Sequence, residues 1–187
     1  SMNFLRSIRD MLAGNSKSSV NISVKWDGAP AIFAGTDPSD GKFFVAKKGI
    51  FNKNPKVYKT PEEIAADTSG DLSKKLTKAL ELLPSLGIKG VIQGDFLFSK
   101  SDLLMQHIDD KKYLSFHPNT IVYAVPSKSA LAYQIAKSEI GIVWHTRYKG
   151  SSFENMSAEF GKNIANSLKQ SRSVFSVDAE YQDTSGS

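Results

Sequence analysis

Apolar and polar residues alternate in three short stretches of the first half of the chain, which is the pattern of strands with one buried face. These stretches are residues 20–25, 31–35 and 42–46. Turn-forming residues separate them, at Asp27–Gly28 and in residues 36–41. The first half of the chain therefore predicts a meander of short antiparallel strands.

Apolar residues recur at helical spacing in four other segments. These segments are residues 3–13, 71–83, 130–137 and 152–169. Pro84 and Gly87 follow the second helix and are expected to end it, and Ser127 is expected to cap the third. Further apolar runs predict strands at residues 90–98, 120–125, 140–145 and 174–181. Helices and strands are mixed without regular βαβ alternation, which favours an α+β fold with antiparallel sheets and flanking helices.

Composition narrows the classes of protein that the chain can represent. It has 187 residues and no cysteine, which excludes a disulfide framework, a thiolate metal site and a cysteine nucleophile. The lack of cysteine also fits a reducing compartment, so we expect a cytoplasmic protein. No apolar run approaches the ~20 residues of a membrane span, so we expect no membrane partner.

Positive charge is concentrated in one stretch of the chain. The net charge is +5, and residues 42–59 contain six lysines and no acid, so the rest of the chain is close to neutral. Phe51 and other aromatic residues alternate with these lysines, as on surfaces that bind single-stranded nucleic acid. The candidate nucleic-acid-binding residues are Lys48, Lys53, Lys56 and Lys59. The alternative is a solvated lysine-rich loop.

A lysine stands at the end of the predicted strand 20–25, in the segment Lys25-Trp26-Asp27-Gly28. Strand alternation points Val24 toward the core and Lys25 to the other side. Burial disfavours the charged ammonium, so a lysine that faces a cleft can act as a nucleophile, with Asp27 near enough to orient it. The alternative is a surface hairpin that carries a Lys–Asp pair.

An acid interrupts the apolar run of residues 90–98, in the pair Gly94-Asp95. A buried carboxylate is costly unless it is paired or solvated, which argues that Asp95 faces a cleft. The alternative is the wet face of an edge strand, which Gln93 would share. His145, at the end of another predicted strand, either lines the cleft or is a hydrogen-bonded structural histidine.

Lys25-Trp26-Asp27-Gly28 resembles the first motif, Lys-x-Asp-Gly, of the covalent nucleotidyltransferases: ATP-dependent DNA ligases, RNA ligases and mRNA capping enzymes. Later segments fall in the order of that family's next motifs. They are Lys47-Lys48-Gly49, Gly94-Asp95, the apolar run with Tyr123, and Glu139-Ile140-Gly141. Residues 25–33 and 51–55 look similar to uncharacterised ligase-like proteins of tailed bacteriophages.

The resemblance implies a ligase-type adenylation domain that uses ATP and Mg²⁺ and joins strands of DNA or RNA. Lys25 would attack the α-phosphate and form a lysyl-AMP intermediate. The implied nucleotide-binding residues are Trp26, Asp27, Gly28, Lys47, Asp95 and Tyr123. Tyr123 would stack on the adenine, and Asp95 and Glu139 would hold the metal.

Among the departures from the family's pattern, two concern the fourth and fifth motifs. Ile140 separates Glu139 from Gly141, and no Lys-x-Lys motif occurs at the expected distance, since Arg147-Tyr148-Lys149 follows too closely. Two alternatives therefore stay open: a catalytically inactive nucleic-acid-binding module of the same fold, and a phage structural or interaction protein.

The sequence predicts one nucleotidyltransferase-like domain over residues 1–181, either complete or shortened from a larger enzyme. Residues 182–187 are polar and are expected to form a disordered tail. We expect a monomer, in the host cytoplasm if a phage encodes it.

Overall fold

The computed structural model describes residues 29–119, 121–161 and 163–179. Its strands are β1 (Ala31–Thr36), β2 (Phe43–Ala46), β3 (Val91–Ser99), β4 (Leu104–Ile108), β5 (Lys111–Phe116), β6 (Tyr123–Pro126), β7 (Ile140–Lys149), β8 (Ser157–Phe160) and β9 (Val174–Asp178). Its α-helices are α2 (Pro61–Asp67), α3 (Gly70–Leu82) and α4 (Ala130–Lys137), and its 3₁₀ helices are η1 (Leu83–Leu86), η2 (Lys100–Asp102), η3 (Phe153–Asn155) and η4 (Ala165–Ser167). The predicted helix 3–13, strand 20–25 and tail 182–187 lie outside the described residues.

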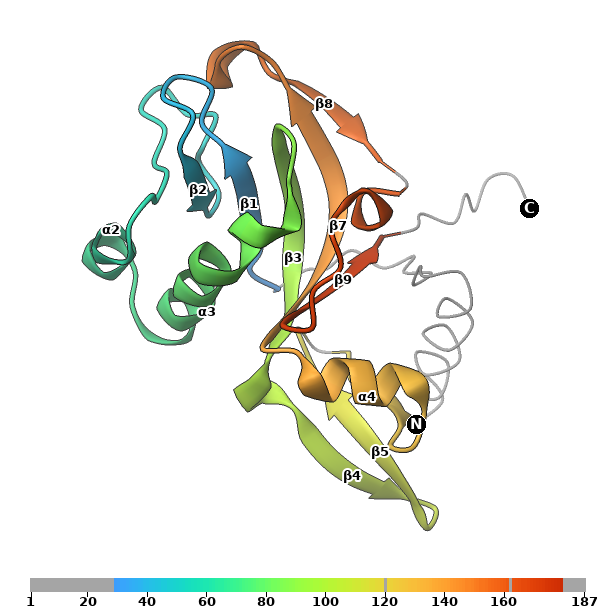
Figure 1. The fold of residues 1–187 in the computed structure, drawn as a ribbon. Coiled ribbons are helices and arrows are strands. Elements are labelled where there is room, and N and C mark those ends of the chain that lie inside the picture. Colours follow the sequence, from blue (N-terminus) through green and yellow to red (C-terminus); the bar gives the residue numbers. More distant parts are fainter. Residues whose placement is uncertain (1–28, 120, 162, 180–187) are drawn as a thin grey trace.

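The strands form two sheets. The larger sheet has the order β2-β1-β3-β7-β8 with β9 beside β7, and the smaller has the order β4-β5-β6. Figure 1 shows α2 and α3 on one side of the larger sheet, and α4 beside the smaller one. Within the described residues every strand pair is antiparallel except β7–β9. The expected α+β class with antiparallel sheets is confirmed.

The larger sheet has two chemically different faces, because successive residues of a strand point to opposite sides. On the first face, Ile32, Ile92 and Ile142 pack in one buried cluster with Leu76 and Ala79 of α3. This is the α3 face. The alternate residues point to the other side, where Asp95 lies opposite Val143 and Gln93 opposite Thr146. This second side is the Asp95 face.

Several elements occur where the pattern of the sequence predicts them. The β1–β2 hairpin closes through Asp37, whose carboxylate accepts hydrogen bonds from the backbone N–H and the hydroxyl of Ser39, both within 2.9 Å. Helix α3 ends near Pro84, as expected, and η1 continues it for one turn. Helix α4 is also confirmed, but its cap is Ser129 instead of Ser127, because the Ser129 hydroxyl accepts from the Ala132 N–H at 3.1 Å.

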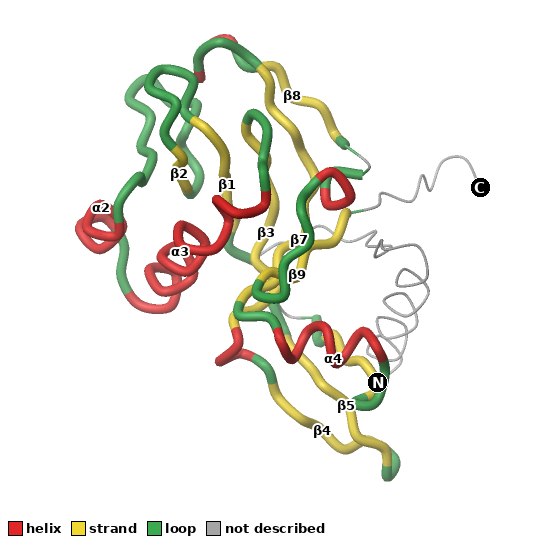
Figure 2. The backbone as a smooth tube through the Cα atoms, viewed as in Figure 1, coloured by secondary structure: helices red, strands yellow, loops and turns green. Residues whose placement is uncertain are grey.

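The predicted helix over residues 152–169 is wrong. The segment contains η3, β8 and η4, and Figure 2 draws it as strand and loop with short helical turns. The edge of β7 offers unpaired backbone groups, and β8 pairs with it, with Glu159 opposite Arg147. Backbone pairing with a sheet edge thus outweighs a helical spacing of apolar residues.

Two elements of the structure had no clear pattern in the sequence. The first is the β4–β5 hairpin, whose turn residues Asp109 and Asp110 both have positive φ angles, of 50° and 66°. The second is helix α2, where Thr60 caps the first turn by accepting from the Glu63 N–H at 3.2 Å. In the described part of the chain, no helix is long and apolar enough to cross a membrane.

Candidate functional site

The centre of the Asp95 face is a pair formed by Asp95 of β3 and His145 of β7. The Nε2 atom of His145 lies 3.5 Å from an Asp95 carboxylate oxygen, and each side chain is 14% exposed. The β3–β7 register shifts between Gln93 and Gly94, so that Thr146 and Trp144 have partners and His145 is the extra residue of a bulge. The bulge turns the His145 side chain toward Asp95.

A second polar pair extends the site along the same two strands. The hydroxyl of Tyr148 donates to the side-chain oxygen of Gln93 at 2.6 Å, and burial raises the pKa of Tyr148. The Tyr148 ring packs on Phe51 with a centroid distance of 4.6 Å, and Phe33 lies within 6 Å of both rings. Phe51 is 43% exposed. The Asp95 face therefore combines an accessible aromatic surface with a carboxylate and an imidazole.

The chain that follows the Lys-x-Asp-Gly segment enters the larger sheet beside Asp95. The Phe96 N–H donates to the Pro30 carbonyl at 2.9 Å, and Ala31 is the register partner of Asp95. Lys25, Trp26, Asp27 and Gly28 themselves lie outside the described residues. The chain that continues from Gly28 is, however, fixed two residues later, where Pro30 and Ala31 pair with β3, the strand that carries the candidate carboxylate.

Lys47 is not brought to Asp95. It follows the end of β2, and its Nζ atom lies 3.8 Å from the carboxylate of Asp67, the last residue of α2. Helix α2 lies on the α3 side of the larger sheet (Figure 1), so Lys47 and Asp95 belong to opposite faces. Tyr58 also donates a hydrogen bond to Asp67, and desolvation and this bond raise the pKa of Tyr58 far above its ordinary value.

Glu139 is also separate from Asp95. Glu139 directly precedes β7 and accepts a hydrogen bond from Lys78 of α3 at 3.0 Å. Asp95 is opposite Val143, four residues further along the strand, which corresponds to about 13 Å. The two carboxylates expected to share a metal ion are therefore too far apart to do so. In residues 29–119, 121–161 and 163–179, no cluster of three His, Asp or Glu side chains could hold a metal.

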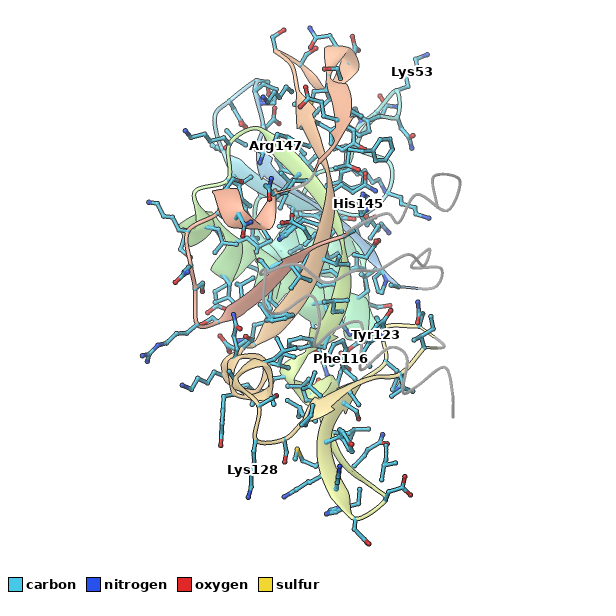
Figure 3. The ribbon with its side chains drawn as sticks, turned by 90° about the vertical axis from the view of Figure 1, so that its right-hand side faces the viewer. Lys53, Phe116, Tyr123, Lys128, His145 and Arg147 are labelled. Carbon is cyan, nitrogen blue, oxygen red and sulfur yellow. The ribbon has the colours of Figure 1, made fainter. Side chains whose placement is uncertain are left out.

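Tyr123 lies on the same side of the molecule as His145 (Figure 3). Its ring stacks on Phe116, with a centroid distance of 5.7 Å and an interplanar angle of 19°, and its side chain is 4% exposed. The same buried cluster contains Leu97 and Val143, which are two of the neighbours of Asp95 on its face. Tyr123 therefore borders the candidate site, although Phe116 already covers one face of its ring.

The lysines expected to bind nucleic acid divide into two kinds. Lys48 and Lys53 are exposed, and Lys53 projects from the molecule in Figure 3. Lys56 and Lys59 instead form ion pairs, Lys56 with Asp67 at 3.0 Å and Lys59 with both Asp37 and Asp40. Residues 42–59 contain lysines and no acid, but acids elsewhere in the chain neutralise part of their positive charge.

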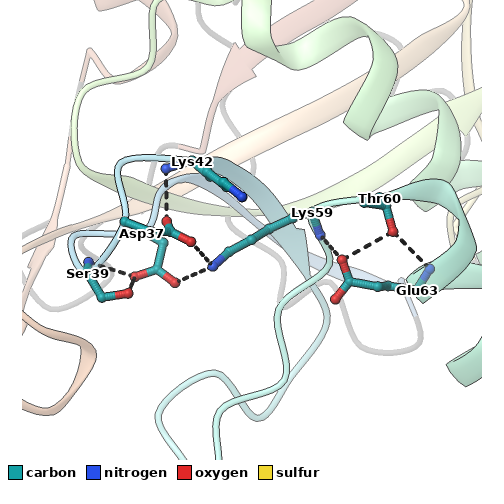
Figure 4. A network of polar contacts seen from close by, with 7 residues as sticks. Asp37, Ser39, Lys42, Lys59, Thr60 and Glu63 are labelled. Atoms are coloured by element: carbon teal, nitrogen blue, oxygen red, sulfur yellow. Dashed lines mark hydrogen bonds and ion pairs between the residues drawn. The ribbon is translucent and has the colours of Figure 1, made fainter.

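Lys59 is the centre of a polar network (Figure 4). Its Nζ lies 2.6 Å from Asp40 and 2.9 Å from Asp37, and these hydrogen bonds raise the pKa of Lys59, with the Asp40 bond as the larger cause. Burial raises the pKa of Asp37, but hydrogen bonds from Lys59 and Ser39 outweigh it and leave the pKa below its ordinary value.

The Lys59→Gln protein is expected to be less stable than the wild type by about 1 kcal/mol at pH 7, the upper end for an ion pair near the surface. The folded-state pKa of Asp37 is lowered, so its contribution is present above the ordinary pKa of 3.8 and is lost as the pH falls further. The difference between the two proteins should therefore shrink below about pH 4. Urea unfolding between pH 7 and pH 2.5 measures it. Lys53→Gln is the control, and an equal loss of stability there would contradict the prediction.

The structure adds residues that sequence reasoning had not placed in the site. The sequence leaves His145 open as either a cleft residue or a structural one, and it puts Gln93 on the face of Asp95 only in the alternative of a wet edge strand. Tyr148 belonged to a segment considered for its charges. Strand alternation could have placed Gln93 beside Asp95, but the bulge at His145 has no signal in the sequence.

Comparison with known proteins gives one family. The chain belongs to the family described as "Family of unknown function (DUF6267)", whose model matches residues 1–187. No curated protein and no solved structure gives a significant match.

Proposed function

We propose that the protein is a ligase-type nucleotidyltransferase, in which Lys25 forms a lysyl-AMP intermediate over the Asp95 face for nucleic-acid strand joining. The observation that carries this proposal is the attachment of the Lys-x-Asp-Gly segment beside Asp95, through the Phe96–Pro30 hydrogen bond at 2.9 Å and the Ala31–Asp95 register. Lys25 lies five positions before Pro30 in the chain, and five residue steps span up to about 17 Å. Lys25 is therefore within reach of Asp95.

The proposed step is nucleophilic substitution at phosphorus. The ammonium of Lys25 first loses a proton, and the free amine then forms an Nζ–P bond to the α-phosphate of ATP. The bond from that phosphorus to the bridging oxygen breaks, pyrophosphate leaves with the electron pair, and the nitrogen releases a second proton to solvent. The product is a phosphoramidate, which acid hydrolyses readily.

The described residues fit Mg²⁺ only in a limited way. A magnesium ion bound with a nucleotide takes one or two protein carboxylates and fills its other positions with phosphate oxygens and water. Asp95 can supply one such carboxylate, whereas Glu139 is paired with Lys78. A bound ion would neutralise charge on the transferred phosphate. The Nε2 atom of His145 lies 3.5 Å from that carboxylate.

The roles of Asp95 and Glu139 are separated by comparing two variants in one labelling assay. The protein is incubated with Mg²⁺ and ATP labelled at the α-phosphate, and acid-labile label on the chain is measured over time. Asp95→Asn is expected to label roughly 100-fold more slowly than the wild type, the usual cost of removing one preorganised group from a reacting site. Glu139→Gln is the matched control, and its labelling rate should stay within about threefold of the wild type. If Glu139→Gln had the larger effect, the proposed site would be wrong.

A catalytically inactive nucleic-acid-binding module is the second candidate. It is supported by the ion pair of Lys47 with Asp67, which occupies a cation that the phosphates of the nucleotide would need. It is also supported by the exposed ring of Phe51, which lies in the loop that carries Lys48 and Lys53. A wild-type protein that takes no label, and that loses oligonucleotide binding on Phe51→Ala, would support this second function.

A further inference from the structure

A groove of about 750 Å³ lies on the side of the molecule away from Asp95. Helix α4 forms one wall, and the segment from η4 to Arg172 forms the other. Val174 and Ser176 of β9 form the floor, and they are the register partners of Ile140 and Ile142, whose side chains lie on the α3 face. The polar side chains that matter for its chemistry are Tyr133, Gln134, Lys137, Asn166, Lys169 and Arg172.

The groove is cationic and contains no acid. Lys137, Lys169 and Arg172 line it, and its lining includes no aspartate or glutamate. In the described part of the chain none of these three cations forms an ion pair, in contrast to Lys56 and Lys59. Three uncompensated charges around one hollow attract an anion with several phosphates.

The position of Lys169 is fixed by the fold. Its backbone N–H donates to the Leu86 carbonyl at 2.9 Å, and its aliphatic chain passes Gly87 so closely that a side chain there would meet it at 3.3 Å. Lys137 is the last residue of helix α4, which is anchored by the buried residues Leu131 and Ile135. The groove therefore presents its charges from ordered backbone, which lowers the entropic cost of binding.

An aromatic ring lies beside these cations. Tyr133 is 57% exposed, and it lies one helical turn before Lys137 on α4. Exposed tyrosine next to lysine and arginine is the combination with which proteins hold unpaired bases and their phosphates. The amides of Gln134 and Asn166 add groups that can both donate and accept hydrogen bonds.

We propose that this groove binds a single-stranded nucleic acid. Its phosphates contact Lys137, Lys169 and Arg172, and one base stacks on Tyr133. The inference deepens the proposed function, and it rests on that function in taking nucleic acid as the ligand. The groove and the Asp95 face lie on opposite sides of the larger sheet, so the groove holds a part of the strand that is distant from the reacting end.

The proposal is tested by binding of fluorescently labelled 12-residue oligo-dT and oligo-U, measured by anisotropy in EDTA without ATP. A single strand releases about 0.7 counterion per neutralised phosphate, so three contacts contribute about two powers of ten in affinity at 0.1 M salt. The triple variant Lys137→Gln, Lys169→Gln, Arg172→Gln should therefore bind about 100-fold more weakly. The slope of log affinity against log salt should decrease by about 2. The ratio of the affinities for oligo-dT and oligo-U shows whether the groove prefers DNA or RNA.

The matched control removes the same charge elsewhere, with Lys74→Gln, Lys111→Gln and Lys112→Gln, all exposed and outside the groove. Its affinity should stay within about threefold of the wild type. Tyr133→Ala should lose roughly tenfold in affinity, whereas Tyr133→Phe keeps the ring and should bind normally. Equal losses in the two triple variants, or a duplex that binds as tightly as the single strand, would contradict the proposal.

The outcome is independent of the labelling reaction. The groove triple variant should take α-phosphate label from ATP at the wild-type rate, because label transfer to Lys25 requires no nucleic acid. Normal labelling with unchanged oligonucleotide binding would overturn the groove and leave the proposed chemistry standing. Weakened oligonucleotide binding by the triple variant, together with no labelling of the wild type, would support the groove and contradict the proposed nucleotidyl transfer.

Discussion

Lys25→Ala is expected to abolish acid-labile labelling by ATP that carries the label on its α-phosphate. Formation of the phosphoramidate requires an amine nitrogen at this position, and alanine has none. Loss of the nucleophile removes the reaction instead of slowing it, so the label should fall to background even after long incubation. The measurement is the label retained on the denatured chain, together with its loss in acid and its survival in alkali.

Two further variants decide whether the loss is specific. Lys25→Arg keeps the positive charge, but its guanidinium is never deprotonated under these conditions, so it should also take no label. Lys53→Ala removes an exposed lysine elsewhere and should label as the wild type does. Retention of label by the Lys25→Ala protein would exclude this lysine as the nucleophile.

Gly94→Ala is expected to lower the free energy of unfolding by about 3 kcal/mol, which corresponds to a decrease of about 10 °C in melting temperature. A methyl group at this position would lie 2.2 Å from the carbonyl oxygen of Val143 and 2.9 Å from the ring of Trp144. Trp144 is fully buried and donates to the hydroxyl of Ser176 at 3.1 Å, so it cannot move aside. The central strands β3 and β7 would have to separate.

Gly41→Ala is the matched control for this substitution. Gly41 has a φ of +72°, but a methyl group there would meet nothing within 4 Å. Its cost is the left-handed backbone conformation alone, about 1 kcal/mol. Thermal unfolding of both variants separates crowding from backbone strain. A Gly94→Ala protein that melts within 2 °C of the wild type would contradict the close approach of β3 and β7.

Gly94 and Asp95 are adjacent in one motif, but they have different roles in the structure. In the sequence, Gly94 and Asp95 together resemble one nucleotidyltransferase motif, and the resemblance implies a nucleotide-binding role for Asp95. In the structure they point to opposite faces, because they are neighbours on one strand. Gly94 allows Trp144 to pack on the α3 face, and Asp95 alone faces the candidate site.

The candidate site could be predicted only where one strand determines the direction of a side chain. Asp95 lies within an apolar run, so its departure from the pattern indicated a cleft. Lys47 follows β2 and Glu139 precedes β7, so strand alternation does not determine the direction of either side chain. Each side chain points to the nearest opposite charge. Those partners, Asp67 and Lys78, lie 20 and 61 residues away along the chain, and no local pattern reveals them.

The sequence by itself determined the local elements whose signals lie within a few residues. The β1–β2 turn depends on the carboxylate of Asp37 and on Gly41, and α3 depends on its apolar stripe and on Pro84. These interactions form between near neighbours, so their chemistry can be recognised in the sequence. They are sufficient for an α+β class and for a list of candidate residues.

Only the tertiary structure decided which candidates share a surface. Residues 157–160 pair as a strand because the edge of β7 is available to them, and His145 faces Asp95 because a bulge interrupts the β3–β7 register. The cationic groove forms because α4 and the segment around Lys169, more than 30 residues apart in sequence, meet over β9. Each of these outcomes depends on contacts between distant residues, whose energies are settled by the packing of the whole chain.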